Sequence, residues 1–137
     1  MPADTRIADR IEIADLVTRF ALLLDEKRWE DAATVFAEDV TVHSPRGGEL
    51  RGIDQVIDFM RRGEVEGERT QHTTTDLLVD VGGDQASASA NSTVYYYHDG
   101  EAPHFTGGLR QHLTATRTPD GWRLREVSIK PAWTREN

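Results

Sequence analysis

The sequence predicts an α+β fold in which three N-terminal helices pack on one face of a strongly curved, mainly antiparallel sheet. Apolar residues recur at steps of three and four from Ile7 to Leu24, and again from Ile53 to Met60. From Thr70 onwards the apolar residues alternate with polar ones in runs that turn signals separate. Helices followed by a run of strands are typical of α+β domains, which predicts helices packed against an antiparallel sheet.

Each expected element is bounded by a cap, a glycine, a proline or a change of period. Asp4 can cap the first helix, which ends at Asp25. A second helix starts at Arg28 or Trp29 and stops near Ala37, before a β-branched run. The further expected elements are a strand over 40–42, a return strand over 49–51, a helix from 53 that frays from 63, and long strands over 70–81, 85–98, 106–118 and 122–133. With no repeat or linker, we expect one domain over 1–137.

Composition excludes several classes of function. The net charge is -8 and the basic residues are scattered, so we expect no nucleic-acid partner. Without cysteine there is no disulfide, thiolate metal site or cysteine nucleophile. No apolar run approaches the ~20 residues of a membrane span, and the first residues lack the regions of a signal peptide. These observations predict a cytoplasmic protein with no membrane partner.

A carboxylate follows directly on the most apolar stretch of the chain. Phe20 to Leu24 are apolar and Asp25 ends the run, while a second apolar pattern begins at Trp29. Asp25 is therefore expected at a helix end beside the core. Because burial disfavours the charged form, a carboxylate there needs a charge or a hydrogen-bond donor as partner.

Five segments in order carry a family resemblance. They are Leu24-Asp25 with Arg28-Trp29, the run 35–40, the run 52–56, Thr70-Gln71-His72 and the run 120–124. In this order they resemble the SnoaL-like branch of the nuclear transport factor 2-like superfamily. The resemblance implies a cone-shaped α+β barrel, wrapped around the first helix to leave a deep apolar pocket. It also implies a homodimer formed through the outer face of the sheet.

The resemblance also implies a site. In the dehydratases and the dehydrochlorinase of the superfamily, an aspartate at the end of the first helix pairs with a histidine on the first long strand, and Asp25 and His72 match these positions. A carboxylate that fixes the tautomer of an imidazole produces a general base. By residue type alone, an aspartate at a helix end is more often a cap or a solvated residue, and a histidine on a strand is more often a packed polar residue than a catalyst.

Further candidates are less sharply marked. The resemblance places His112 near an asparagine of scytalone dehydratase, as a proton donor or hydrogen-bond partner, although alternation alone makes a surface histidine equally possible. The tyrosine that the dehydratases carry near the end of the first helix is missing, so an acid would come from Tyr95, Tyr96 or His112. We expect Trp29, Phe59 and Tyr96 to contact a substrate.

Two hypotheses follow for the function. The first is a cofactor-free lyase or isomerase of the dehydratase or polyketide cyclase type, with the Asp25–His72 dyad as base and an apolar, oxygen-bearing small molecule as substrate. The second is a non-catalytic small-molecule-binding or assembly module with the same fold. The histidines are dispersed and no HExxH, GxSxG, P-loop or GxGxxG motif occurs, so we expect neither a metal nor another cofactor.

Overall fold

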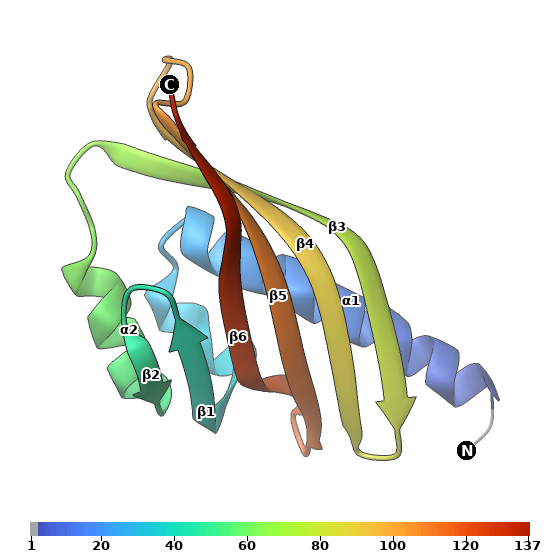
Figure 1. Cartoon of the computed structure of the whole chain (residues 1–137). Coiled ribbons are helices and arrows are strands. Elements are labelled where there is room, and N and C mark those ends of the chain that lie inside the picture. The colour runs from blue at the N-terminus through green and yellow to red at the C-terminus, as the bar shows by residue number, and fades with distance from the viewer. Residues whose placement is uncertain (1–2) are drawn as a thin grey trace.

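The computed structural model describes residues 3–137, with side chains described from Arg6 onwards. The expected cap Asp4 therefore concerns a side chain outside those described. The chain forms α1 (Ala3–Asp25), the 3₁₀ helix η1 (Trp29–Thr34), β1 (Phe36–Ser44), β2 (Gly48–Arg51), α2 (Ile53–Arg62), β3 (Glu68–Gly82), β4 (Gln85–His98), β5 (Phe105–Thr118) and β6 (Gly121–Glu136) (Figure 1).

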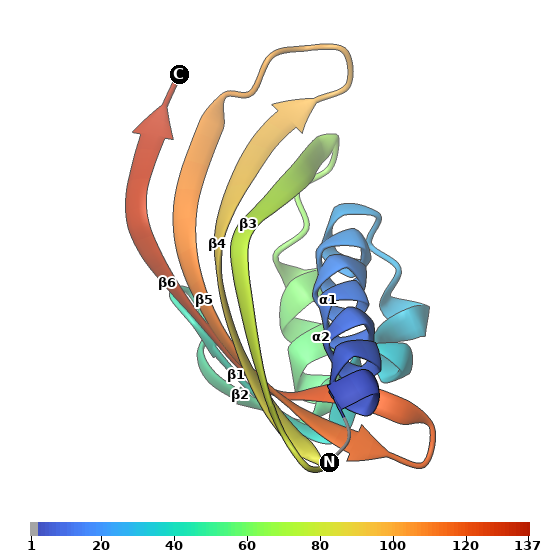
Figure 2. The same cartoon turned by 90° about the vertical axis from the view of Figure 1, so that its right-hand side faces the viewer.

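The six strands form one mixed sheet in the order β2-β1-β6-β5-β4-β3. Strands β3 to β6 are antiparallel neighbours, and β1 runs parallel to β6. All helices lie on one side of the sheet, which curves around them (Figure 2). The α+β class and the curved, mainly antiparallel sheet are thus confirmed. The expected barrel is not closed, because β2 and β3 remain as free edges on opposite sides of the sheet.

The core lies between α1 and the inner face of the sheet. From α1 it takes Ile13, Leu16, Phe20 and Leu23, which pack against buried residues of β1, β5 and β6. Ile7 belongs to the predicted apolar stripe but is exposed. The reason is geometric, because the N-terminal turns of α1 extend past the edge strand β3 (Figure 1).

The second predicted helix is shorter than expected, and the strand after it begins earlier. The 3₁₀ helix ends at Thr34, and β1 starts at Phe36 rather than at Val40. The backbone N–H of Leu124 donates to the carbonyl oxygen of Val35 at 2.8 Å, and Phe36 pairs with Leu124 in register. Pairing with β6 therefore draws the chain into the sheet where local sequence favours a helix.

A bulge in β3 changes which side chains face the core. Alternation predicts His72, Thr74, Asp76 and Leu78 on one face. The register shifts between Thr75 and Leu78, and Asp76 takes a positive φ of 55°. As a result Leu78 is 73% exposed, and the prediction is wrong beyond the bulge.

A buried ion pair fixes the N-terminal half of α1 to the hairpin between β5 and β6. Arg117 donates to both carboxylate oxygens of Asp9, at 3.1 and 2.8 Å, and Trp122 Nε1 donates to Asp9 Oδ1 at 3.1 Å. The hydrogen bonds from Arg117, more than those from Trp122, hold the pKa of Asp9 below its ordinary value against the opposing effect of burial. The pair positions α1 across the inner face.

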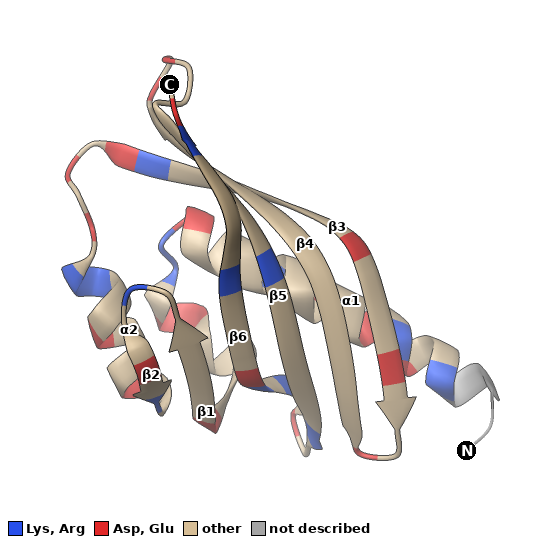
Figure 3. Ribbon diagram, viewed as in Figure 1, with Lys and Arg blue, Asp and Glu red and all other residues tan. Residues whose placement is uncertain are grey.

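Charged residues of both signs are spread over the helices and the sheet (Figure 3). Within the described part of the chain, none of the helices combines the length and the apolar character needed to cross a membrane.

Candidate active site

Asp25 and His72 lie in direct contact, although 47 positions separate them in the sequence. The Nδ1 atom of His72 is 2.5 Å from Asp25 Oδ1. The backbone N–H of His72 donates to Asp25 Oδ2 at 2.8 Å, and the Thr70 hydroxyl donates to Asp25 Oδ1 at 3.0 Å. Both carboxylate oxygens are therefore engaged, and the pairing expected from the resemblance is present in the structure.

Local backbone geometry places the two side chains together. The helix ends at Asp25 because Lys27 takes a left-handed φ of 54°, while the N–H of Arg28 donates back to the carbonyl of Leu23 at 3.1 Å. On β3, Thr70 and His72 are two residues apart, so both face inward towards the helix end. The end of α1 and the first half of β3 thus build the site.

The hydrogen-bond pattern defines the tautomer of His72. An ionised carboxylate can only accept, so Nδ1 carries the proton and Nε2 keeps its lone pair. The side chains of His72 and Asp25 are only 10% and 15% exposed. A charge-assisted hydrogen bond in such a setting is stronger than a neutral one. The arrangement can accept a proton at Nε2 and stabilise the resulting imidazolium.

The dyad borders an apolar pocket of about 510 Å³. His72 and Thr70 form part of its wall, together with residues from β1, α2 and the inner face of β4 to β6. Its apolar lining is Leu24, Trp29, Phe59, Met60, Val65, Val94, Tyr96, Phe105, Leu109 and Ile129. Trp29, Phe59 and Tyr96, for which we predicted substrate contacts, all line it, and those contacts stay a prediction.

Four charged residues at the pocket were not anticipated from the sequence: Lys27, Arg46, Glu64 and Glu68. Both carboxylates are engaged. Trp29 Nε1 donates to Glu64 Oε1 at 2.7 Å, and His104 Nε2 lies 3.0 Å from Glu68 Oε2. These contacts connect segments far apart in the chain, so no local pattern could have marked them.

His112 does not join the dyad. It is exposed and pairs in register with Ser89 and Ser128 on the outer face of the sheet. The physical reason is that successive side chains on a strand point to opposite faces. On β5 the buried Gln111 points inward, so the next residue, His112, points outward. Tyr95 likewise lies on the opposite face of β4 from Tyr96. Of the three acids considered, only Tyr96 lines the pocket.

Two buried polar atoms beside the pocket lack a partner. Gln111 is 4% exposed and Ser92 is 2% exposed, and neither Gln111 Oε1 nor Ser92 Oγ has a hydrogen-bond partner among the described residues. Gln111 pairs in register with Ile129 of the pocket wall. An unpaired buried polar group is costly, which marks both as residues that sequence reasoning missed. For Gln111 the sequence offered one signal: it lies two residues before the apolar Leu113, and residues two apart on a strand share a face.

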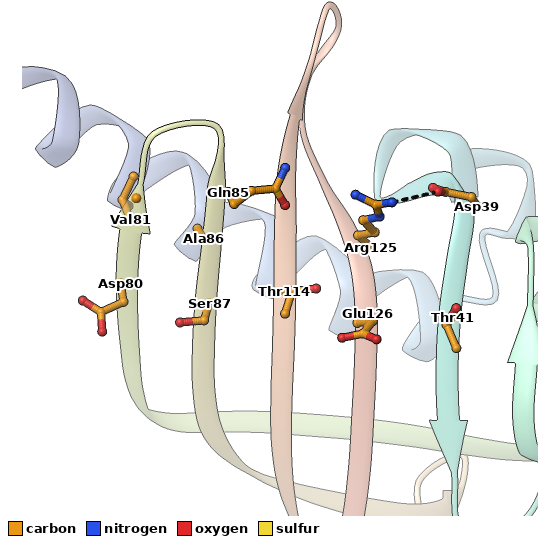
Figure 4. Close-up of a pocket in the computed structure, with 11 residues that line it drawn as sticks. Asp39, Thr41, Asp80, Val81, Gln85, Ala86, Ser87, Thr114, Arg125 and Glu126 are labelled. Atoms are coloured by element: carbon orange, nitrogen blue, oxygen red, sulfur yellow. Dashed lines mark ion pairs between the residues drawn. The ribbon is translucent and has the colours of Figure 1, made fainter. Parts of the chain in front are cut away.

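A second hollow, of about 840 Å³, lies on the outer face of the sheet. Asp80, Ser87, Thr114, Glu126 and Thr41 of its lining project from β3, β4, β5, β6 and β1 on the side away from α1 (Figure 4). Arg125 and Asp39 form an ion pair there at 3.5 Å. This hollow has the larger volume, but most of its lining residues are polar and none is a histidine, so the dyad pocket is the better candidate for chemistry. Within residues 3–137, no cluster of three or more His, Cys, Asp or Glu residues could hold a metal ion.

The open, curved sheet around α1, with a pocket between them, defines the cone-shaped fold of the nuclear transport factor 2-like superfamily. Comparison with protein families then places the chain in one branch of it. The chain belongs to the SnoaL-like domain family, which matches residues 5–128. Among curated proteins, none matches this sequence.

Solved structures share the fold at low sequence identity. The Kfla4162 protein from Kribbella flavida is 22% identical, with a TM-score of 0.83 over 95% of each chain. A proposed scytalone dehydratase from Novosphingobium aromaticivorans is 16% identical, with a TM-score of 0.85 over 99% of this chain and 92% of the other. A type 3 LinA hexachlorocyclohexane dehydrochlorinase from Novosphingobium barchaimii is 14% identical, with a TM-score of 0.84 over 96% and 92%.

Proposed function

We propose that this protein is a cofactor-free general acid/base enzyme of the lyase or isomerase type. Its substrate is an apolar, oxygen-bearing small molecule. The observation that supports this best is the dyad itself: Asp25 holds Nδ1 of His72 at 2.5 Å, which leaves Nε2 as a base at the wall of an apolar pocket. The structural neighbours named as a dehydratase and a dehydrochlorinase support elimination chemistry.

The proposed reaction begins with removal of a proton. The apolar body of the substrate packs against Trp29 and Phe59, and His72 Nε2 takes a proton from a carbon next to a carbonyl group. The electron pair of that C–H bond forms a new double bond while the leaving group departs or the carbonyl becomes an enol. Asp25 stabilises the imidazolium, and the Tyr96 hydroxyl supplies a proton to the oxygen that gains charge.

Proton exchange tests the proposal without a known natural substrate. A panel of cyclic ketones and β-hydroxy ketones is incubated in D₂O, and deuterium uptake or loss of water is followed by NMR. We expect the wild type to accelerate exchange or elimination for some members, and His72→Ala to lose about 10²–10⁴-fold of that rate. The matched control is His112→Ala, a histidine on the outer face that should leave the rate unchanged. Equal rates for the His72→Ala variant and the wild type would contradict the proposal.

One observation favours the alternative, a non-catalytic binding module. Of the candidate acids Tyr95, Tyr96 and His112, only Tyr96 lines the pocket. A reaction that needs a stronger acid than a tyrosine hydroxyl therefore has no donor among these three residues. In that case ligands bind the pocket, but neither exchange nor elimination is faster than in buffer.

A further inference from the structure

We propose that Arg46 binds an anionic oxygen of the ligand at the mouth of the pocket, so that the protein selects apolar carboxylates over neutral molecules of the same shape. The inference rests on the proposed function in one respect, namely that the dyad pocket is the substrate site. Arg46 lines this pocket, although it belongs to the turn between β1 and β2.

The turn that carries Arg46 is built to hold its position. The Ser44 hydroxyl oxygen lies 3.3 Å from the backbone N–H of Arg46 and 3.5 Å from that of Gly47, and accepts from both. Gly47 packs so closely on Phe59 that an added Cβ would come within 2.8 Å of the ring. A loop anchored in this way loses little further freedom when a ligand binds.

The guanidinium group lies near the aromatic wall of the pocket, although Arg46 as a whole is exposed. Its central carbon lies 5.8 Å from the centroid of the Tyr96 ring. This distance is within the range of a cation–π contact. A contact with the ring face leaves the guanidinium N–H groups available to a planar anion such as a carboxylate.

Among the described side chains, Arg46 has no acidic partner. Arg46 forms neither an ion pair nor a side-chain hydrogen bond with the described side chains, whereas Glu64 and Glu68 at the same pocket are engaged by Trp29 and His104. The chain has 24 acidic residues against 16 basic ones, so an acidic partner would be easy to supply. Arg46 is exposed, so water solvates its charge when the pocket is empty. A ligand that brings a carboxylate to the pocket mouth replaces this water with a charge-assisted hydrogen bond.

Strand register gives the scale of the ligand. Tyr96 pairs with Thr70, which lies two residues before His72 on β3. One strand spacing and two residues along a strand separate the Cα atoms of Tyr96 and His72 by about 8 Å. The guanidinium carbon of Arg46 lies a further 5.8 Å from the Tyr96 ring. A substrate that reaches both Arg46 and His72 therefore carries its carboxylate at the opposite end from the carbon that loses a proton.

Matched pairs of probes test the inference. Benzoate, naphthoate and anthracene carboxylate are each compared with the corresponding neutral amide by isothermal titration calorimetry. We expect at least one carboxylate to bind the wild type about tenfold or more tightly than its amide, since hydrogen bonds to charged groups exceed neutral ones by this order. Arg46→Met keeps the apolar stem and should abolish the preference. Arg110→Met, on the outer face, should preserve it.

Two outcomes would overturn the inference: no carboxylate in the panel binds more tightly than its amide, or the Arg46→Met variant keeps the preference while circular dichroism shows an unchanged fold. The test is separate from catalysis. If His72→Ala leaves all measured reactions unchanged but the carboxylate preference depends on Arg46, the proposed activity fails and the anion site stands.

Discussion

Replacing Asp25 with asparagine tests the geometry of the dyad without a known substrate. The change keeps the shape of the side chain but replaces one acceptor oxygen by an NH₂ donor. In the wild type, one carboxylate oxygen accepts from the backbone N–H of His72 at 2.8 Å. The other accepts from Nδ1 at 2.5 Å and from the Thr70 hydroxyl at 3.0 Å. Asparagine cannot satisfy all three of these donors.

The two orientations of the amide differ in free energy. If its oxygen faces Nδ1, the NH₂ group opposes the backbone N–H of His72, and an unpaired N–H in this setting costs about 1–3 kcal/mol. If its oxygen faces the backbone N–H, the NH₂ group donates to Nδ1 and the imidazole proton moves to Nε2. The second orientation is therefore favoured by roughly 5- to 160-fold, since each 1.36 kcal/mol is a factor of ten. That tautomer has no lone pair at Nε2.

Nitrogen NMR of isotope-labelled histidine reports the tautomer directly. At mildly alkaline pH, we expect His72 of the wild type to carry its proton on Nδ1 and His72 of Asp25→Asn to carry it on Nε2. Thr70→Val is the matched control, because it removes one bond to Asp25 but leaves both bonds from His72. If the proposed activity is found, its rate should fall by about 10²–10⁴-fold in Asp25→Asn. An Asp25→Asn variant that keeps the Nδ1–H tautomer would refute the reasoning.

Three further predictions concern stability and assembly. Gln111→Leu removes the buried unpaired oxygen, so urea denaturation should show equal stability or a gain of about 1–3 kcal/mol; a clear loss would show that this oxygen has a partner in solution. Since its bonds to Arg117 hold the pKa of Asp9 below 3.8, ionised Asp9 stabilises the fold fully above pH 3.8 and loses this effect as the pH falls through the lower folded-state pKa. Asp9→Asn should flatten the acid limb of a plot of Tm against pH, and an unchanged limb would contradict this. We also expect a homodimer formed through the outer face, where Trp133 is 51% exposed; light scattering at the mass of one 15.4 kDa chain would disprove it.

Much of the fold follows from local patterns, because period and turn chemistry are short-range properties. The long strands begin and end within a few residues of the predicted bounds, and Gly63 ends α2 as expected. The predicted bounds are wrong where pairing with a strand far away in the sequence outweighs the local preference for a helix. Phe36 joins the sheet through Leu124, and a helix prediction from neighbouring residues cannot include that partner.

The site was predictable only in part for a related reason. Asp25 and His72 could be named because segments around them resemble a family, while their contact depends on the turn at Lys27 and on the register of β3. Alternation alone left open whether His112 faces inward or outward, because neighbouring residues on a strand lie on opposite faces. Arg46 acquires its place from contacts with Tyr96 and with a turn packed on α2, which are tertiary features.

The bulge at Asp76 divides β3 into two halves, and the positions that face inward change from even-numbered to odd-numbered residues across it. Before it, even-numbered positions such as Thr70 and His72 face the pocket; after it, odd-numbered positions such as Leu77 and Val79 pack against the core. The half that lines the pocket and the half that packs on the core are thus specified by separate sets of residues. We therefore expect substitutions at exposed positions of the first half, such as Thr73, to leave the core packing of Leu77 and Val79 unchanged.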